Sequence, residues 1–173
     1  MALDTWTVYA PGVTYTTSKS LIDLFNDDAT AKAKLWRLWL LNNQTGAITG
    51  VVLLLLFRRL TTAPPTGGTA LTPIPHDSAG TALDAQITQG TGRTPTAGAT
   101  FRRVMVSSDE PAVSGATWDE LECIVPFSVL WDSGYGDSNV APMKFHENEG
   151  FDLQQSTTSV VGTCDINYEF TQE

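Results

Sequence analysis

Two histidines and two cysteines are the side chains in this sequence best suited to bind a metal ion or to attack a substrate. His76 stands between proline and aspartate, His146 stands between phenylalanine and glutamate, and Cys123 and Cys164 lie in apolar, strand-like segments. A zinc site needs three or four converging ligands, and no spacing here groups them. We therefore expect surface or turn histidines, buried thiols and no metal. Whether the cysteines pair stays open, because a disulfide needs an oxidising compartment and adjacent Cβ atoms.

Other catalytic patterns are incomplete. No serine lies in a Gly-x-Ser-x-Gly turn, and no glycine-rich phosphate loop ends in Lys-Ser or Lys-Thr. Four carboxylates could be imagined as the source of a glycosidase pair: Glu110, Asp119, Glu120 and Glu122. The Asp132–Asp137 loop has oxygen donors at alternate positions but lacks the glutamate that completes an EF-hand calcium loop. The sequence predicts that the protein is not an enzyme and needs no cofactor.

The charge balance and the apolar runs exclude further classes of function. The net charge is −9, from 19 acidic and 10 basic residues, whereas a nucleic-acid-binding protein normally presents a basic face. We interpret the arginine pairs at 58–59 and 102–103 as strand-end or interface charges rather than a phosphate-facing patch. Met1–Pro11 lacks the features of a signal peptide, and the longest apolar run, Val51–Phe57, is too short to cross a bilayer. We expect no direct nucleic-acid contact, no membrane association and synthesis in a host cytoplasm.

The segments of the chain that must position these residues are predicted to be strands. Threonine, glycine, serine and proline fill the gaps between apolar runs, which is typical of strands and turns. Thr5–Ala10 alternates as a short first strand before a Pro-Gly turn, and Ser18–Asn26 fits either a helical turn or a strand. Leu35–Leu41 and Ala47–Leu60 are separated by an Asn/Gly-rich turn, which predicts a β-hairpin. The second of these is apolar on both faces and must be covered on both.

The second half of the chain begins with an unusual connection. Thr61–Thr100 is rich in proline and glycine and predicts a long, extended, turn-rich segment, in which Ala70–Pro75 could add an edge strand. Strands are expected after it, in the following ranges: Phe101–Val106, Leu121–Leu130 with a bend at Pro126, Met143–His146, Phe151–Leu153 and Cys164–Phe170. The last of them alternates most clearly, which predicts one buried and one wet face.

These elements predict an all-β, single-domain β-sandwich of the jelly-roll kind, with 173 residues being enough for one core. Residues 1–17 would form an extended N-terminal arm or a first strand, residues 18–173 the sandwich, and 61–100 the long connection within it. Alternation would place Trp36 and Trp39 on opposite faces of one strand, and core packing, sugar stacking and subunit contact all remain open for such rings. We expect the following residues to contact partners: Trp6, Tyr9, Trp36, Trp39, Pro64, Pro65, Pro73 and Pro75.

Several stretches carry a resemblance to a known class of proteins. They are Leu35–Leu60, the Thr/Gly/Pro-rich middle, Ser107–Pro111, and Phe145–Leu153 followed by Gly162 and the strand to Phe170. In these the sequence resembles virion structural proteins of tailed bacteriophages, especially small β-sandwich proteins that decorate heads or build tail and fibre parts. The resemblance implies a homo-oligomer, often a trimer, located in the virion and bound to the major capsid protein or other virion proteins. It implies no catalytic residues.

Three functions follow as expectations. The leading one is a capsid decoration or cement protein that lays extended segments, Met1–Thr17 and Thr61–Thr100, along neighbouring subunits. The second is a tail, fibre or head–tail connector component. The third, from another class, is a carbohydrate-binding β-sandwich that stacks sugars on exposed aromatic rings.

Overall fold

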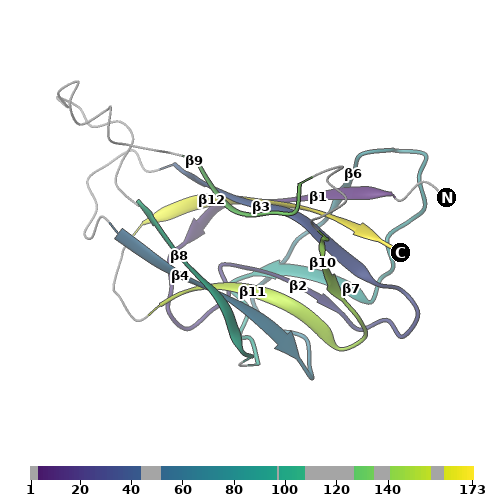
Figure 1. Ribbon diagram of the computed structural model, residues 1–173, viewed down its shortest axis with the longest axis horizontal. Helices are drawn as coiled ribbons and strands as arrows, with labels where there is room; N and C mark the ends of the chain where they lie inside the picture. Colours follow the sequence, from purple (N-terminus) through teal and green to yellow (C-terminus); the bar gives the residue numbers. More distant parts are fainter. Residues whose placement is uncertain (1–3, 44–51, 97, 108–126, 135–140, 157–161) are drawn as a thin grey trace.

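The chain folds into two antiparallel sheets that pack face to face. The computed structural model describes residues 4–43, 52–96, 98–107, 127–134, 141–156 and 162–173, and within these ranges it contains twelve strands and no helix. Figure 1 shows the sheets as an upper and a lower layer. The all-β sandwich expected from the sequence is thus confirmed.

Each sheet has six strands. The first, sheet A, runs in the order β10 (Met143–Phe145), β3 (Ala33–Asn42), β12 (Thr163–Gln172), β1 (Thr5–Thr14) and β6 (Ile74–Pro75). The sixth strand, β9 (Phe127–Asp132), also pairs with β3, farther along that strand than β10. The second, sheet B, runs in the order β5 (Thr69–Ala70), β7 (Ile87–Thr91), β2 (Ile22–Asn26), β11 (Glu149–Gln155), β4 (Val52–Thr61) and β8 (Thr100–Ser107).

The core lies between the sheets and is rich in aromatic rings. On β12 the alternation predicted from the sequence is confirmed, because Ile166, Tyr168 and Phe170 are buried while the residues between them are partly exposed. Phe151 of β11 meets Tyr168 edge to face, with ring centroids 5.3 Å apart, so the two sheets contact each other through these rings. Such a pair adds about 0.5–1.5 kcal/mol beyond the apolar area it buries.

The strands pair in a nested order, in which the first strand pairs with the last, the second with the last but one, and so on inward. β1 pairs with β12, β2 with β11, β3 with β9 and β10, and β4 with β8. Among the first four strands, each one lies in the opposite sheet from the strand before it. The predicted hairpin between Leu35–Leu41 and Ala47–Leu60 is therefore wrong: both segments are strands, but β3 belongs to sheet A and β4 to sheet B. A hairpin would need a two- to five-residue loop, and the connection from Asn42 to Val52 is longer.

The N-terminal region is a strand of the sandwich and not an extended arm. β1 pairs along its length with β12, from Thr5 opposite Thr171 to Thr14 opposite Thr163. The Pro-Gly turn expected at residues 11–12 is an irregularity inside this strand, where the register shifts between Ala10 and Val13. β12 occupies one edge of β1 along its length, and β6 pairs with the other edge at Trp6 and Thr7.

The long connection folds back onto its own domain. It contains β5 and β6, at the edges of sheets B and A, in place of the single edge strand expected over Ala70–Pro75. It also contains β7, which the sequence did not reveal. We call residues 62–68, 92–96, 98 and 99 the strap; its two parts are joined by the Thr66–Thr94 bridge, and Ala99 accepts a hydrogen bond from the Arg59 amide of β4. At Gly98 a Cβ would overlap the Arg59 carbonyl oxygen, so only glycine fits there.

The remaining strand predictions are mostly confirmed. β8 presents Val104 and Val106 to the core and Met105 to the outside, as its alternation indicates. The first part of the predicted strand Leu121–Leu130 lies outside the described residues, and β9 continues to Asp132, two residues past the expected end of that strand. Within the described ranges, the structure contains no helix with the length and apolar character that a bilayer crossing requires.

Candidate functional site

The histidines and cysteines of the sequence are not brought together in the part of the chain that the structure describes. His76 Nε2 lies 2.7 Å from the Thr7 hydroxyl at the surface, and His146 is exposed. Burial raises the pKa of the Cys164 thiol to about 12, so it is protonated at neutral pH and is a poor nucleophile. Cys123 lies outside the described residues. Among those described, no three histidine, cysteine or acidic side chains are placed to hold a metal ion.

All four carboxylates considered for catalysis lie outside the described ranges, and these are Glu110, Asp119, Glu120 and Glu122. Of the loop 132–137, only Asp132, Ser133 and Gly134 are described. Asp132 Oδ1 accepts a hydrogen bond from the Gly134 amide at 2.8 Å and lies 3.5 Å from Arg37 Nε. These interactions account for its position without a bound cation.

The residues expected to contact partners fall into two groups. Trp6 and Pro65 are buried within the domain, where Trp6 stacks on Phe170 with ring centroids 5.6 Å apart, so neither offers a surface in this structure. The others are half-buried or exposed, and these are Tyr9, Trp36, Trp39, Pro64, Pro73 and Pro75.

The two tryptophans of β3 do not follow simple alternation. The register against β12 shifts at Trp36, where Arg37 faces Glu169 and Leu35 faces Phe170. Such a bulge adds one residue to the strand and breaks the period of two. The Trp36 indole donates a hydrogen bond to Thr171, whereas Trp39 lies in a groove on the outer face of sheet A.

This outer face carries a row of apolar side chains, which we call the sheet A strip: Trp39 and Leu41 of β3 with Phe127 and Val129 of β9. Trp39 is paired with Val129 and Leu41 with Phe127 across the two strands. Phe127 and Val129 are 47% and 53% exposed. Single apolar residues on a surface are ordinary, but a contiguous group marks a contact site. β9 could have been recognised from sequence as apolar on both faces, the pattern noted for Val51–Phe57.

Polar groups border the sheet A strip. Together with Trp39, Phe127 and Val129, the charged residues Arg37, Asp132 and Glu169 line an open groove of about 420 Å³. Arg37 and Asp132 form an ion pair at 3.5 Å. The groove therefore combines an apolar floor with two carboxylates and one guanidinium, an arrangement suited to docking a protein surface or stacking a ring.

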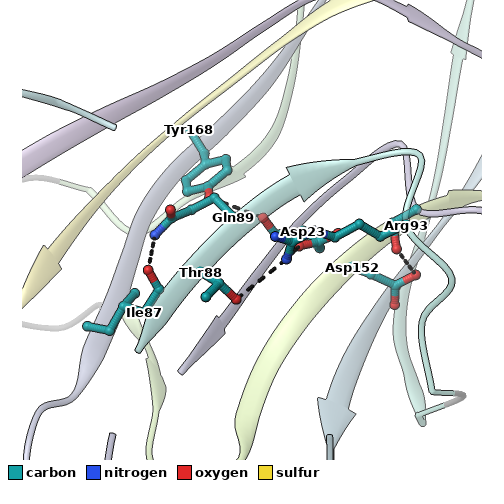
Figure 2. Close-up of polar contacts among 8 residues, drawn as sticks. Asp23, Ile87, Thr88, Gln89, Arg93, Asp152 and Tyr168 are labelled. Atoms are coloured by element: carbon teal, nitrogen blue, oxygen red, sulfur yellow. Dashed lines mark hydrogen bonds and ion pairs between the residues drawn. The ribbon is translucent and has the colours of Figure 1, made fainter. Parts of the chain in front are cut away.

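A second feature is a buried group of charges on the outer side of sheet B, beneath the strap. Asp23 of β2 and Asp152 of β11 are paired across the two strands, and both are fully buried. Arg93, from the strap, lies 3.1 Å from Asp23, and Arg58 of β4 donates two hydrogen bonds to Asp152, at 3.1 and 2.7 Å. Figure 2 shows Asp23, Arg93 and Asp152, with Tyr168 donating to the Asp23 carbonyl oxygen. The strap is thus attached to sheet B by an ion pair.

The two carboxylates differ in their electrostatics. Asp152 has both oxygens hydrogen-bonded by Arg58, yet burial still raises its pKa. Asp23 has one oxygen, Oδ2, buried without a hydrogen-bond partner in the structure. Burial raises the pKa of Asp23 to about 7; Arg93 offsets part of this rise, and the negative charge of Asp152 adds to it. These groups are enclosed, so we assign them to stability and not to ligand binding.

Gly90 allows Arg93 to reach Asp23, because it faces Asp23 on the neighbouring strand and a Cβ there would overlap the Arg93 side chain. The substitution Gly90→Ala is expected to displace the guanidinium and to lower the free energy of unfolding by about 1–3 kcal/mol, the usual cost of overpacking. Urea denaturation measures this. The control is Arg93→Ala: once the guanidinium is gone, adding Gly90→Ala should have little further effect. An equal loss in both backgrounds would contradict the steric explanation.

Comparisons of this chain with protein-family models, with curated proteins and with solved structures found no match. The function must therefore be argued from the geometry.

Proposed function

We propose that this protein is a structural component of a bacteriophage virion, a capsid decoration protein bound to major capsid subunits, and that it assembles through the sheet A strip. The observation that carries the proposal is the exposure of Phe127 and Val129 beside Trp39 and Leu41 on one sheet face. Aromatic rings are enriched at protein interfaces. The sequence resemblance to phage virion proteins supplies the identity of the particle.

The strand order supports the finer fold of a jelly roll. In that fold two Greek keys are wound into two sheets, so that the closing strand returns beside the first. The nested pairs agree with this, since β12 lies between β1 and β3 and β11 lies between β2 and β4. Jelly rolls occur in viral capsid proteins but also in lectins and cupins. The fold alone does not select a function, and the exposed sheet A strip is the feature that supports the proposal.

The contacts proposed here differ from those expected from the sequence. The extended segments that were to lie along neighbouring subunits, 1–17 and 61–100, contribute strands to their own domain, because β1 pairs with β12 and β6 and because β5, β7 and β2 pair in that order. The face of sheet A is the better candidate, because Phe127 and Val129 are exposed and no segment among the described residues covers them.

The test is the amount of the chain in purified particles, measured by quantitative mass spectrometry against the major capsid protein. Abundance comparable with that protein is expected for a decoration protein. A few copies per particle would place it in the tail, fibre or connector, and absence from particles would overturn the proposal. Val129→Glu should remove the chain from particles without unfolding it. Ile74→Glu is the control, because Ile74 is 61% exposed on β6, outside the strip.

One observation favours a second candidate, a carbohydrate-binding module. A cross-strand row over four strands of sheet A contains Tyr9, Asn167, Trp39 and Val129. The two aromatic residues are separated by two strand spacings, ~10 Å, with an amide between them. Binding on a glycan array that is lost in both Tyr9→Ala and Trp39→Ala would favour this function. An array on which the protein binds no glycan would exclude the carbohydrate-binding function.

A further inference from the structure

A second apolar patch lies on the outer face of sheet B, away from the strap. Met105 of β8 is 71% exposed and faces Leu54 of β4 across the pair, while Arg103 faces Leu56. Leu54 and Leu56 are half-buried and Arg103 is exposed. Residues that face each other across two strands present their side chains to the same side. These four residues, which we call the β8 patch, therefore form one surface with an apolar floor and a positive charge.

The β8 patch and the sheet A strip are complementary. The strip has an apolar floor bordered by Glu169 and Asp132, with Arg37 already paired to Asp132. The β8 patch has an apolar floor bordered by Arg103, for which the described residues provide no salt bridge. One surface thus has an excess of negative charge and the other an excess of positive charge. Complementary charge at the border of an apolar contact fixes the register and excludes like-charged partners.

The two surfaces face in opposite directions, because the strip is on the outer face of sheet A and the patch on the outer face of sheet B; Figure 1 shows these sheets as separate layers. They cannot meet within one chain. We propose that the occupant of the sheet A strip is the β8 patch of a second copy of this chain, with Arg103 of one copy opposite Glu169 of the next. This rests on the proposed function only in taking the strip to be an assembly surface.

The contact is heterologous, since each copy uses two different surfaces. A heterologous contact forms a ring where its rotation closes and an open filament where it does not. A closed ring such as the trimer expected from the sequence would leave no strip exposed. In such a ring the strip joins copies of this chain, and Val129→Glu would remove the chain from particles by preventing the ring from forming.

The test is a charge exchange read out by light scattering after gel filtration. The wild-type chain is expected to have a mass of several copies. Arg103→Glu and Glu169→Lys each place like charges opposite each other and should weaken association at least tenfold. Mixing these two variants should restore a complex, because the carboxylate introduced in one then faces the ammonium group introduced in the other. The double variant should associate with itself again for the same reason. Circular dichroism confirms that each variant is folded.

Each other outcome overturns the inference. A wild-type chain with the mass of one copy has no such contact, and loss of association in Glu169→Lys alone means that the strip meets another surface. Loss in both variants without restoration on mixing means that the two charges do not face each other. The virion test is independent: a single-copy chain found in particles overturns only this inference, whereas a charge-exchanged oligomer absent from particles overturns only the proposed function.

Discussion

Replacing Arg58 with alanine is expected to lower the free energy of unfolding by about 3–5 kcal/mol. The side chain is 13% exposed and donates both of its hydrogen bonds to Asp152, which is fully buried. Without the guanidinium, the Asp152 carboxylate stays inside the protein, and among the described residues the long Ser20 hydrogen bond of 3.4 Å is what remains to stabilise its charge. The penalty reflects this isolated charge more than the attraction that is lost. Urea denaturation at pH 7 measures the effect.

The next residue provides a matched control. Arg59 pairs with Glu149 at 2.6 Å, but the two side chains are 40% and 25% exposed, so water stabilises both charges when the pair is broken. Arg59→Ala is expected to cost about 0–1 kcal/mol. A second variant separates charge from packing: adding Asp152→Asn to Arg58→Ala removes the isolated charge and should recover part of the loss. Equal costs for the two arginines would show that Asp152 is not desolvated as the structure indicates.

The stability of the protein is expected to fall as the pH rises from about 4 to about 7. Asp23 has an ordinary pKa of 3.8 when unfolded and about 7 when folded. The folded state therefore binds this proton more tightly than the unfolded state, and the resulting stabilisation is complete below pH 4. It is lost as the pH rises through 7, at a rate of up to ~1.4 kcal/mol per pH unit. The raised pKa of Asp152 acts in the same direction.

The variant Asp23→Asn isolates this effect, because an amide cannot titrate. The difference in unfolding free energy between wild type and Asp23→Asn should change steadily between pH 4 and 8, with the wild type losing relative stability. Asp28→Asn is the control: hydrogen bonds from the Ala31 amide and from Thr30 lower the pKa of Asp28, so it titrates below this range. A difference that stays constant with pH for Asp23→Asn would show that its carboxyl group is not desolvated.

More acidic solutions are expected to reverse the trend. The Lys34 and Lys144 side chains hold the pKa of Glu173 at about 2. For Glu149, burial alone would raise the pKa, but the His146 amide and Arg59 lower it overall. Groups with lowered pKa values contribute stability that is lost as the pH falls through those values. Stability is therefore expected to be greatest at mildly acidic pH.

Individual strands could be predicted from the sequence because their signals are local. β12 shows the clearest case. One of its faces is buried and the other is exposed to solvent, so apolar and polar residues alternate along its sequence. Ser18–Asn26 could not be resolved for the opposite reason. Every residue of β2 is buried, and Asp23 on its outer face contacts Arg93 of the strap, so burial does not alternate along the strand.

Strand partners could not be predicted, because they depend on residues far apart. Leu35–Leu41 and Ala47–Leu60 looked like a hairpin from their adjacency, yet each pairs with strands from the C-terminal half of the chain. The buried charges could not be predicted from the sequence for a similar reason. Asp23 and Asp152 each lie within an apolar stretch, and the sequence pattern fits side chains on a solvated outer face. In the folded protein they are buried, because Arg93 and the strap cover them. Within the sheet A strip, only Trp39 was singled out from the sequence.

The nested pairing also constrains the order in which the protein can fold during its synthesis. β12 is the central partner that joins β1 to β3, and it is made of residues 163–172. β1 must therefore wait until β12 has been synthesised before it has a partner for most of its length. Domains built on such distant contacts fold slowly and expose unpaired strand edges while they wait. We expect folding to be completed only after β12 has been synthesised, and to benefit from chaperones that shield β1 and β3 until then.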